Sequence, residues 1–204
     1  WFHIWPNAYK DNSTALSKQA LEDGDKKGYY STEQERGFIN GLNFKVNGEM
    51  IRWDYHPEHI DICKLLLNKP LKAGESIQIS TPFFVKIPDA KFSRLGHVDQ
   101  SYMITQWYPK PAVFDKDGWH EMPYLGMGEF YSEFGSFDVS ITLPSNYTVG
   151  ATGDLQNKGE LARLNELAKA TDTITRFSND MSFPLSDLST KTLRYIQKDV
   201  HDFG

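Results

Sequence analysis

Apolar and polar residues alternate along several short stretches of this 204-residue chain. Leu42, Phe44 and Val46 alternate up to Asn47-Gly48, and residues 50–55 follow directly. Asn-Gly between two such runs is the strongest short signal for a β-hairpin. The pattern therefore predicts an antiparallel hairpin at this point.

More strands are predicted on the same grounds. Residues 60–67 and 76–86 are separated by a turn-like stretch and are expected to pair, with Pro82 marking an edge or a bulge because proline has no N–H to donate. Residues 137–143 alternate so strictly that one face of that strand must be buried. Residues 192–203 return to a strand-like composition.

Two segments depart from this period of two. Residues 14–22 carry a weak helical pattern, with Ser13 or Thr14 as a cap and Gly24 where a helix would stop. Residues 159–170 predict a second short helix, because Leu161, Leu164 and Ala168 fall on one helical face.

Strands dominate, and the chain has no internal repeat, low-complexity tract or Pro/Ser-rich linker. A half-buried sheet needs a second layer to cover its apolar face. We therefore predict an all-β fold, an antiparallel β-sandwich with one or two short peripheral helices, as a single domain over residues 1–204.

Composition excludes some classes of partner. The net charge of -5 gives no basic surface for following a phosphate backbone, so nucleic acid is not an expected partner. The longest apolar run, residues 60–67, contains Asp61 and Lys64 and is far shorter than the roughly 20 residues of a membrane span. The single cysteine, Cys63, allows no internal disulfide and is expected to be a small apolar strand residue.

Two places resemble metal sites. The segment 120–124, His-Glu-Met-Pro-Tyr, begins like HExxH, but the second histidine is replaced by Tyr124 and Pro123 would break the helix that this motif needs. A polar loop beside Trp119 is the prediction there. His56 and His59, with Asp54 and Asp61 nearby, are interpreted as a solvated turn, and a weak surface metal site is the alternative.

Other chemistry is poorly supported. The chain has no G-x-S-x-G elbow and no Gly-rich phosphate loop, and His3, His97 and His201 stand singly. Glu121, Glu129 and Glu133 lie close enough in sequence to leave a hydrolase with a carboxylate pair as one hypothesis.

Aromatic residues are concentrated in the middle of the chain. They serve either as the core and rim of long loops or as a surface that packs on another domain or holds a ligand. These residues are Trp107, Tyr108, Trp119, Tyr124, Phe130 and Tyr131.

The run Thr105-Gln106-Trp107-Tyr108-Pro109-Lys110-Pro111, followed at 137–144 by Phe-x-Val-x-Ile-x-Leu-Pro, resembles the amino-terminal β-domain of aminopeptidase N-like zinc metallopeptidases, in a bacterial branch of that family. The resemblance is strongest over residues 102–153. The segment 126–130, Gly-Met-Gly-Glu-Phe, departs from the family's GxMEN strand, because Met comes one position early and Phe130 replaces Asn. A Gly-rich turn is predicted there instead.

The resemblance implies that the full enzyme removes amino-terminal residues from peptides with a zinc ion held by HExxH and a later Glu in the next domain. It implies no catalytic residue and no metal ligand in this chain, and a junction to the catalytic domain at about residues 200–204. The β-domain forms one wall of the substrate cleft, where Gln106 matches the glutamine that helps to hold the substrate's terminal residue. Tyr108 stands where family members often carry Glu or Gln, in the first specificity pocket.

Three hypotheses follow. The leading one is a non-catalytic amino-terminal domain of a zinc aminopeptidase, with a peptide substrate and the downstream catalytic domain as partners, in a periplasmic, cell-surface or secreted location. The alternative is a stand-alone β-sandwich module that binds carbohydrate or peptide through its aromatic loops. The third is a complete hydrolase that uses the acids between Glu121 and Glu133.

Overall fold

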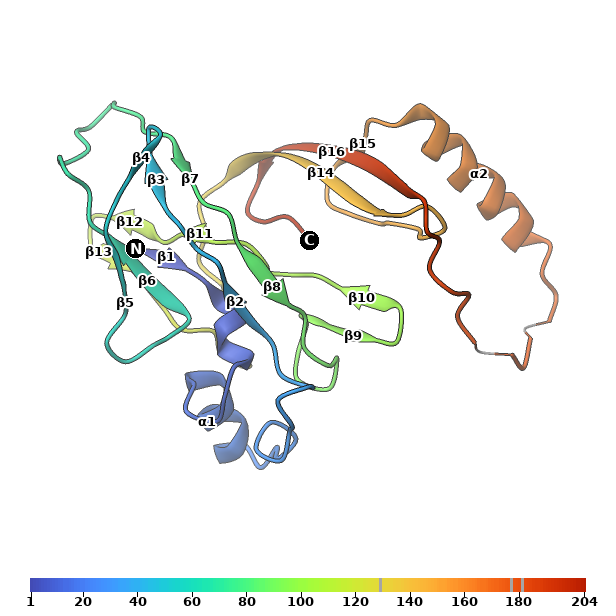
Figure 1. Ribbon diagram of the computed structural model, residues 1–204, viewed down its shortest axis with the longest axis horizontal. Helices are drawn as coiled ribbons and strands as arrows, with labels where there is room; N and C mark the ends of the chain where they lie inside the picture. Colours follow the sequence, from blue (N-terminus) through green and yellow to red (C-terminus); the bar gives the residue numbers. More distant parts are fainter. Residues whose placement is uncertain (129, 177, 181) are drawn as a thin grey trace. The chain divides into compact units, whose positions relative to one another are not determined.

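A computed structural model describes residues 1–128, 130–176, 178–180 and 182–204. The chain divides into two compact units, Trp1–Ser132 (unit 1) and Glu133–Gly204 (unit 2), which are described separately below (Figure 1). The expected single domain over residues 1–204 stays a prediction.

Unit 1 is built from short strands with two helical segments. The helical segments are the 3-10 helix η1 (Trp5–Tyr9) and α1 (Ala15–Glu22). The strands are β1 (Phe2–His3), β2 (Phe38–Asn40), β3 (Lys45–Val46), β4 (Glu49–Met50), β5 (Trp53–Tyr55), β6 (Ile62–Leu65), β7 (Ile79–Ser80), β8 (Phe84–Lys86), β9 (Gly96–Val98), β10 (Ser101–Met103), β11 (Lys110–Pro111), β12 (Val113–Asp115) and β13 (Gly118–His120).

The largest sheet of unit 1 has the strand order β11-β1-β6-β5. Phe2 pairs with Cys63 on one side and with Pro111 on the other, and both pairings are antiparallel. β1 is therefore an inner strand, and it joins segments that are far apart in the sequence.

The predicted hairpin turn at Asn47-Gly48 is confirmed, but only the start of the expected return strand pairs there, because residues 53–55 form β5 and pair with β6. β3 pairs with β4, and Asn47 and Gly48 have φ angles of 50° and 90°. Both turn residues thus have positive φ, as a two-residue hairpin turn of this class requires.

The predicted pairing of residues 60–67 with 76–86 is wrong. β6 pairs with β1 and β5, while β7 pairs with β3 and β8 pairs with β2. The stretch between these two segments does contain a turn, but β6 before it and β7 after it belong to different sheets.

The first predicted helix is confirmed as α1. The Thr14 hydroxyl oxygen accepts from the Ser17 backbone N–H at 3.2 Å, which caps the helix, and Gly24 follows it with φ +84°.

Two apolar clusters form the core of unit 1. One gathers around β1, β2 and β6 and contains Ile4, Ile39, Phe44 and Cys63. The Cys63 thiol is fully buried, and burial raises its pKa to about 12. The predicted apolar role of Cys63 is confirmed, and the thiol is unreactive in the folded state because the thiolate is the reactive form. The second cluster surrounds Trp5 and Tyr124.

Unit 2 is a three-stranded antiparallel sheet with one helix. Its elements are β14 (Gly135–Pro144), β15 (Asp154–Leu155), α2 (Lys158–Asp172) and β16 (Thr190–Val200), with the strand order β14-β16-β15. β14 confirms the alternation read from the sequence, since Phe137, Val139, Ile141 and Leu143 are half-buried while the residues between them are exposed.

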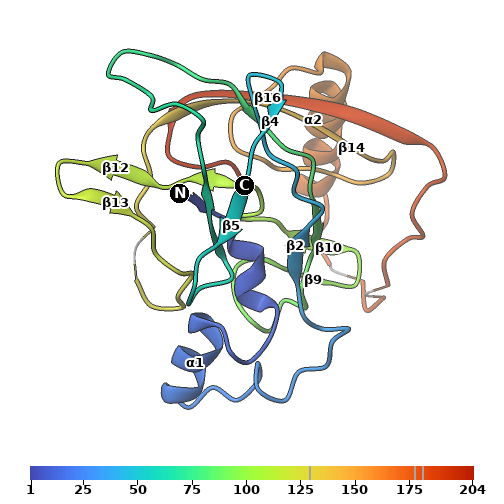
Figure 2. The same ribbon diagram turned by 60° about the vertical axis from the view of Figure 1, so that its left-hand side comes forward.

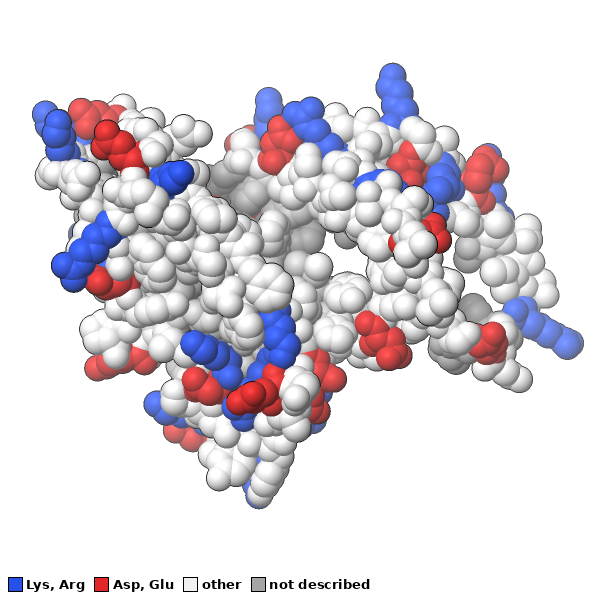
Figure 3. All heavy atoms as spheres, viewed as in Figure 1, with Lys and Arg blue, Asp and Glu red and all other residues white. Residues whose placement is uncertain are grey.

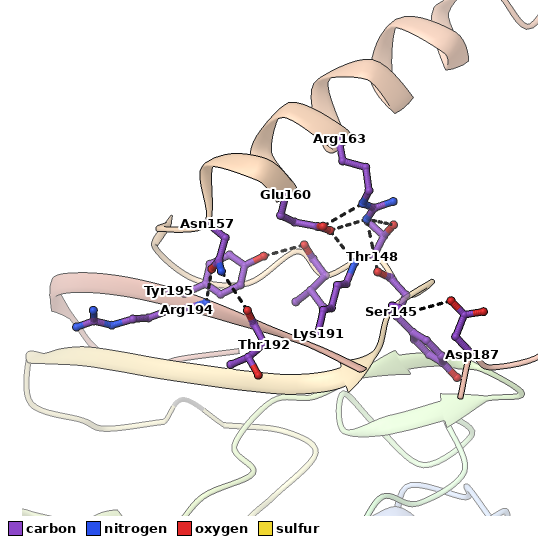
Figure 4. Close-up of polar contacts among 12 residues, drawn as sticks. Ser145, Thr148, Asn157, Glu160, Arg163, Asp187, Lys191, Thr192, Arg194 and Tyr195 are labelled. Atoms are coloured by element: carbon purple, nitrogen blue, oxygen red, sulfur yellow. Dashed lines mark hydrogen bonds and ion pairs between the residues drawn. The ribbon is translucent and has the colours of Figure 1, made fainter. Parts of the chain in front are cut away.

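Polar side chains hold the start of α2 on β16 (Figure 4). Asn157 precedes the helix, and its amide donates to the Thr192 carbonyl at 3.0 Å and accepts from the Arg194 N–H at 2.8 Å. The Glu160 carboxylate accepts from Arg163 at 2.5 Å and from Lys191 at 2.8 Å. Beyond this first part the helix is mostly exposed, Leu161 and Ala168 included, and only Leu164 of the predicted apolar face is half-buried.

Glu160 is the centre of this contact. Its side chain is 8% exposed, and the bonds from Arg163 and Lys191 lower its pKa to about 2. The carboxylate therefore stabilises the fold above its ordinary pKa of about 4.5, and this contribution is lost as the pH falls toward 2.

We expect Glu160→Gln to destabilise unit 2 by about 2 kcal/mol, because it leaves two cations without their shared partner. The measurement is hydrogen exchange of the β16 amides at neutral pH. Glu166→Gln is the matched control, because Glu166 pairs with Lys169 on the same helix but its side chain is 73% exposed. This change should alter the free energy derived from hydrogen exchange by less than about 0.5 kcal/mol. Equal effects of the two changes would contradict the prediction.

The chain is mainly β in the described residues, as predicted, and its sheets are small. The finer expectation of a sandwich stays a prediction. Neither α-helix of the described part has the length and apolarity of a membrane-crossing segment. On the face shown in Figure 3, acidic and basic side chains are interspersed.

Candidate functional site

The segment that the sequence analysis singled out, Thr105-Gln106, follows β10 and lies outside any strand. Gln106 is half-buried and has φ 48°, in the left-handed region. Among the described residues, every other residue with positive φ is Gly, Asn or Asp. A side chain with a Cβ loses about 1–2 kcal/mol in this conformation, so the surroundings of Gln106 must impose it.

The polar atoms of this segment are incompletely paired. The Thr105 hydroxyl and the Gln106 amide oxygen are shielded from solvent, and neither has a hydrogen-bond partner in the described part of the chain. A shielded acceptor without a partner costs roughly 1–3 kcal/mol. Backbone strain and an unpaired acceptor thus coincide at one residue, which is typical of functional positions.

The aromatic residues that follow anchor the segment. Trp107 packs against the core cluster of Trp5 and Tyr124, and its ring centroid lies 5.9 Å from that of Phe83 and 5.3 Å from that of Tyr108. Tyr108 is half-buried. The chain then enters β11, which pairs with β1. Gln106 therefore lies between a half-buried tryptophan that packs on the core and the mostly exposed β9–β10 hairpin.

Residues 121–124 form a loop after β13, as predicted, while His120 is the last residue of that strand. The Met122 N–H donates to His3 Nε2 at 3.2 Å, and the Met122 carbonyl accepts from Trp5 Nε1 at 3.2 Å. Burial, followed by the charge of Lys110, lowers the pKa of His3 to about 4. His3 is therefore neutral at pH 7, and its Nε2 is the acceptor.

Buried groups also hold the next residues. The Tyr124 N–H donates to Asp61 Oδ2 at 2.6 Å, and burial raises the pKa of Asp61 against the effect of this bond. The Gln19 amide oxygen accepts from the backbone N–H groups of Gly126 and Met127 at 2.7 and 3.1 Å. The loop is thus tied to β1, η1, α1 and the start of β6, and Tyr124, expected in a polar loop, is fully buried. Glu129, in the Gly-rich segment, lies outside the described residues.

The two histidines near β6 form a structural turn. The rings of His56 and His59 stack at 5.0 Å, and His56 Nδ1 accepts from the backbone N–H groups of Glu58 and His59. This use of Nδ1 agrees with the predicted turn. No group of three metal-ligating side chains gathers among the described residues.

The β12–β13 hairpin displays two different faces, and it extends away from the neighbouring strands in Figure 2. Phe114 and Trp119 face each other across it, 64% and 48% exposed, with ring centroids 5.0 Å apart. On the other face, His120 Nε2 lies 2.8 Å from Asp115 Oδ1. The hydrogen bond with His120 lowers the pKa of Asp115.

The His120–Asp115 pair was missed in the sequence analysis, although a signal for it exists. Asp117-Gly118 is a hairpin dipeptide, and the hairpin that it predicts places residues 115 and 120 on one face. The Tyr131 hydroxyl donates to the other oxygen of Asp115 at 3.2 Å.

The expected carboxylate pair stays a hypothesis, because its three acids are not all in one described unit. Glu121 is half-buried, and its Oε2 has no hydrogen-bond partner among the described residues. Glu133 belongs to unit 2, and Glu129 is not described. The ring of His97 stacks on that of Tyr102, and the ring of His201 is tilted against that of Phe134, with 3.8 Å between the centroids.

Fold and site together define a mainly-β protein with a strained glutamine and an aromatic hairpin at its surface. No protein-family model, curated protein or solved structure matches the chain.

Proposed function

We propose that this chain is the non-catalytic amino-terminal domain of a zinc-dependent aminopeptidase and forms one wall of its substrate cleft. The proposal rests on the resemblance of the Thr105-Gln106 segment and of the strand at 137–144 to that family. The observation that supports it best is the strained backbone of Gln106, combined with its unpaired amide oxygen. Strain of this kind is retained where a side chain must be held in one position.

Under this proposal Gln106 helps to anchor the amino terminus of the peptide. A neutral amide can accept a hydrogen bond from an ammonium group or donate one to a carbonyl, and it leaves no unpaired charge when the cleft is empty. Tyr108 lies two residues further on and contributes to the pocket for the first side chain. Zinc and its ligands belong to the following domain, and the location implied is periplasmic, cell-surface or secreted.

The test uses the complete protein that contains this chain. We expect Gln106→Ala to lower kcat/KM for an amino-terminal peptide substrate by about 10- to 100-fold, the equivalent of one hydrogen bond to a charged group. The free energy of unfolding should change by less than about 1 kcal/mol, since the lost contacts are few. Gln100→Ala, in the neighbouring β9–β10 turn, is the control and should leave kcat/KM unchanged.

A second variant separates the side chain from the backbone. Gln106→Gly removes the amide but adopts positive φ without strain, so it should be more stable than Gln106→Ala and equally impaired in turnover. Unchanged kcat/KM in both variants would contradict the proposed role of Gln106.

A second candidate is a binding module for carbohydrate or peptide. The exposed pair of Phe114 and Trp119 favours it, because aromatic faces on a projecting hairpin provide a contact surface at low conformational cost. Saturable binding of a sugar or peptide by this chain alone, lost in Trp119→Ala, together with no peptidase activity of the complete protein, would favour this candidate over the first.

A further inference from the structure

A hollow of about 390 Å³ opens on the surface of unit 1, away from any motif recognised in the sequence. Its wall includes Lys10, which follows η1, and Phe38 and Lys86, which are directly paired across β2 and β8. The residues that line it are Lys10, Glu33, Gln34, Arg36, Phe38 and Lys86. Three of these six side chains are cationic and one is acidic.

None of the three cations forms an ion pair with a carboxylate in the part of the chain that the structure describes. Arg36 donates from Nε to the Ser31 hydroxyl at 2.8 Å and from Nη2 to the Asn12 amide oxygen at 3.0 Å. Lys86 donates to the Glu33 backbone carbonyl at 2.5 Å. These acceptors are neutral, so they orient the cations without cancelling their charge.

Some other cations of the chain are neutralised by a carboxylate. Lys91, close to the same region, pairs with Glu35, and Arg194 pairs with Asp138. The chain as a whole has a net charge of -5, so acidic partners are plentiful. Three cations without a carboxylate partner among the described residues thus gather around one hollow of a chain that is acidic overall.

The arrangement suits a particular kind of anion. Glu33 leaves a net charge of about +2 around the hollow, which matches a phosphate monoester, because that group carries close to two negative charges at pH 7. The guanidinium of Arg36 is already oriented by two hydrogen bonds and retains further N–H donors for oxygen atoms. Phe38, half-buried and 6.1 Å from the ring of Phe84, adds an apolar wall for the group that carries the phosphate.

We propose that this hollow binds a small phosphate monoester whose organic part is aromatic or apolar, with Arg36, Lys86 and Lys10 on the phosphate and Phe38 on the organic part. The site is distinct from the Thr105-Gln106 segment and does not depend on the proposed peptidase function.

The experiment is a titration of the isotopically labelled chain at pH 7.5, followed by amide chemical shifts. Phenyl phosphate should shift the amides of residues 10, 33–38 and 86 saturably, with a Kd of about 1 mM or tighter, whereas benzoate, with one charge, should bind at least about 10-fold more weakly. Inorganic phosphate should shift the same amides with lower affinity than phenyl phosphate. Raising the salt concentration should weaken all three, because the contacts are charged and open to solvent.

Variants separate the roles. Arg36→Gln should weaken phenyl phosphate binding at least about 10-fold, and Lys10→Gln, at an exposed position, should weaken it about 3-fold. Arg52→Gln, an exposed arginine paired with Asp54, is the matched control and should not change the Kd. Phe38→Leu should weaken phenyl phosphate but not inorganic phosphate.

Two results would overturn the proposal. One is the absence of saturable shifts at these amides with phenyl phosphate. The other is equal binding by Lys10→Gln, Arg36→Gln and Arg52→Gln, which would show that the anion responds to general surface charge.

Discussion

Replacing Trp5 with alanine is expected to lower the free energy of unfolding by about 3–5 kcal/mol, as for other large core side chains. Trp5 is 1% exposed, and its ring stacks on His3 at 4.3 Å and contacts Phe130 at 4.6 Å between centroids. Its indole N–H also donates to the Met122 carbonyl, so the variant leaves both a cavity and a lost hydrogen bond.

The measurement is urea unfolding followed by the reaction of Cys63 with a thiol reagent. This thiol is fully buried in unit 1 and becomes reactive only when the surrounding core opens. Trp119→Ala is the matched control, because Trp119 is the same residue type at 48% exposure, and it should cost less than about 1 kcal/mol. Similar losses of unfolding free energy in the two variants would contradict the expected contribution of Trp5 to the core of unit 1.

Acid is expected to destabilise the protein through His3 by about 3 kcal/mol between pH 6.5 and pH 4. The pKa of His3 is lowered from 6.5 to about 4 in the folded state. Between these two pH values the unfolded chain therefore binds a proton at His3 that the folded chain does not bind. Stability is therefore at its full value above pH 6.5, falls as the pH drops toward 4, and changes no further through this residue below that value.

The measurement compares unfolding of the unchanged chain with that of His3→Gln across this pH range. Glutamine keeps an acceptor for the Met122 N–H but does not titrate, so the His3→Gln curve should lose this slope and the difference between the two curves should equal the contribution of His3. The comparison is needed because Asp61 lies in the same network and its raised pKa acts in the opposite direction. His97→Gln, which changes a less buried histidine, should retain the slope, and a retained slope in His3→Gln would contradict the assignment.

Local signals in the sequence predicted local structure well. Asn47-Gly48 predicted the β3–β4 turn because only residues that tolerate positive φ fit there. The alternation at 137–143 predicted β14, since one face of that strand is covered and the other is exposed. In both cases the information lies within ten residues of the chain.

Strand partners were not predictable in the same way. β6 precedes a turn signal that leads toward β7, yet it pairs with β1 and β5. The choice depends on which apolar faces can be buried together, and the core around Ile4, Ile39 and Cys63 is assembled from distant segments. No local pattern encodes such pairing.

The candidate site was likewise predictable only in its local part. The sequence singled out Gln106 by its neighbours, but its left-handed backbone and unpaired oxygen depend on the tertiary structure and cannot be read from the sequence. The hollow of Arg36 and Lys86 was missed altogether, because its cations come from separate segments and the overall charge of the chain is negative.

The position of β1 also bears on how unit 1 folds. Phe2 must meet both Cys63 and Pro111, so the central sheet is completed only after two long loops have closed. Loop closure over such separations slows folding, and until β11 arrives β1 has an open edge that can pair with another molecule. The strand that makes the native core non-local is therefore also the strand whose unpaired edge offers a place for association with another molecule before the sheet is complete.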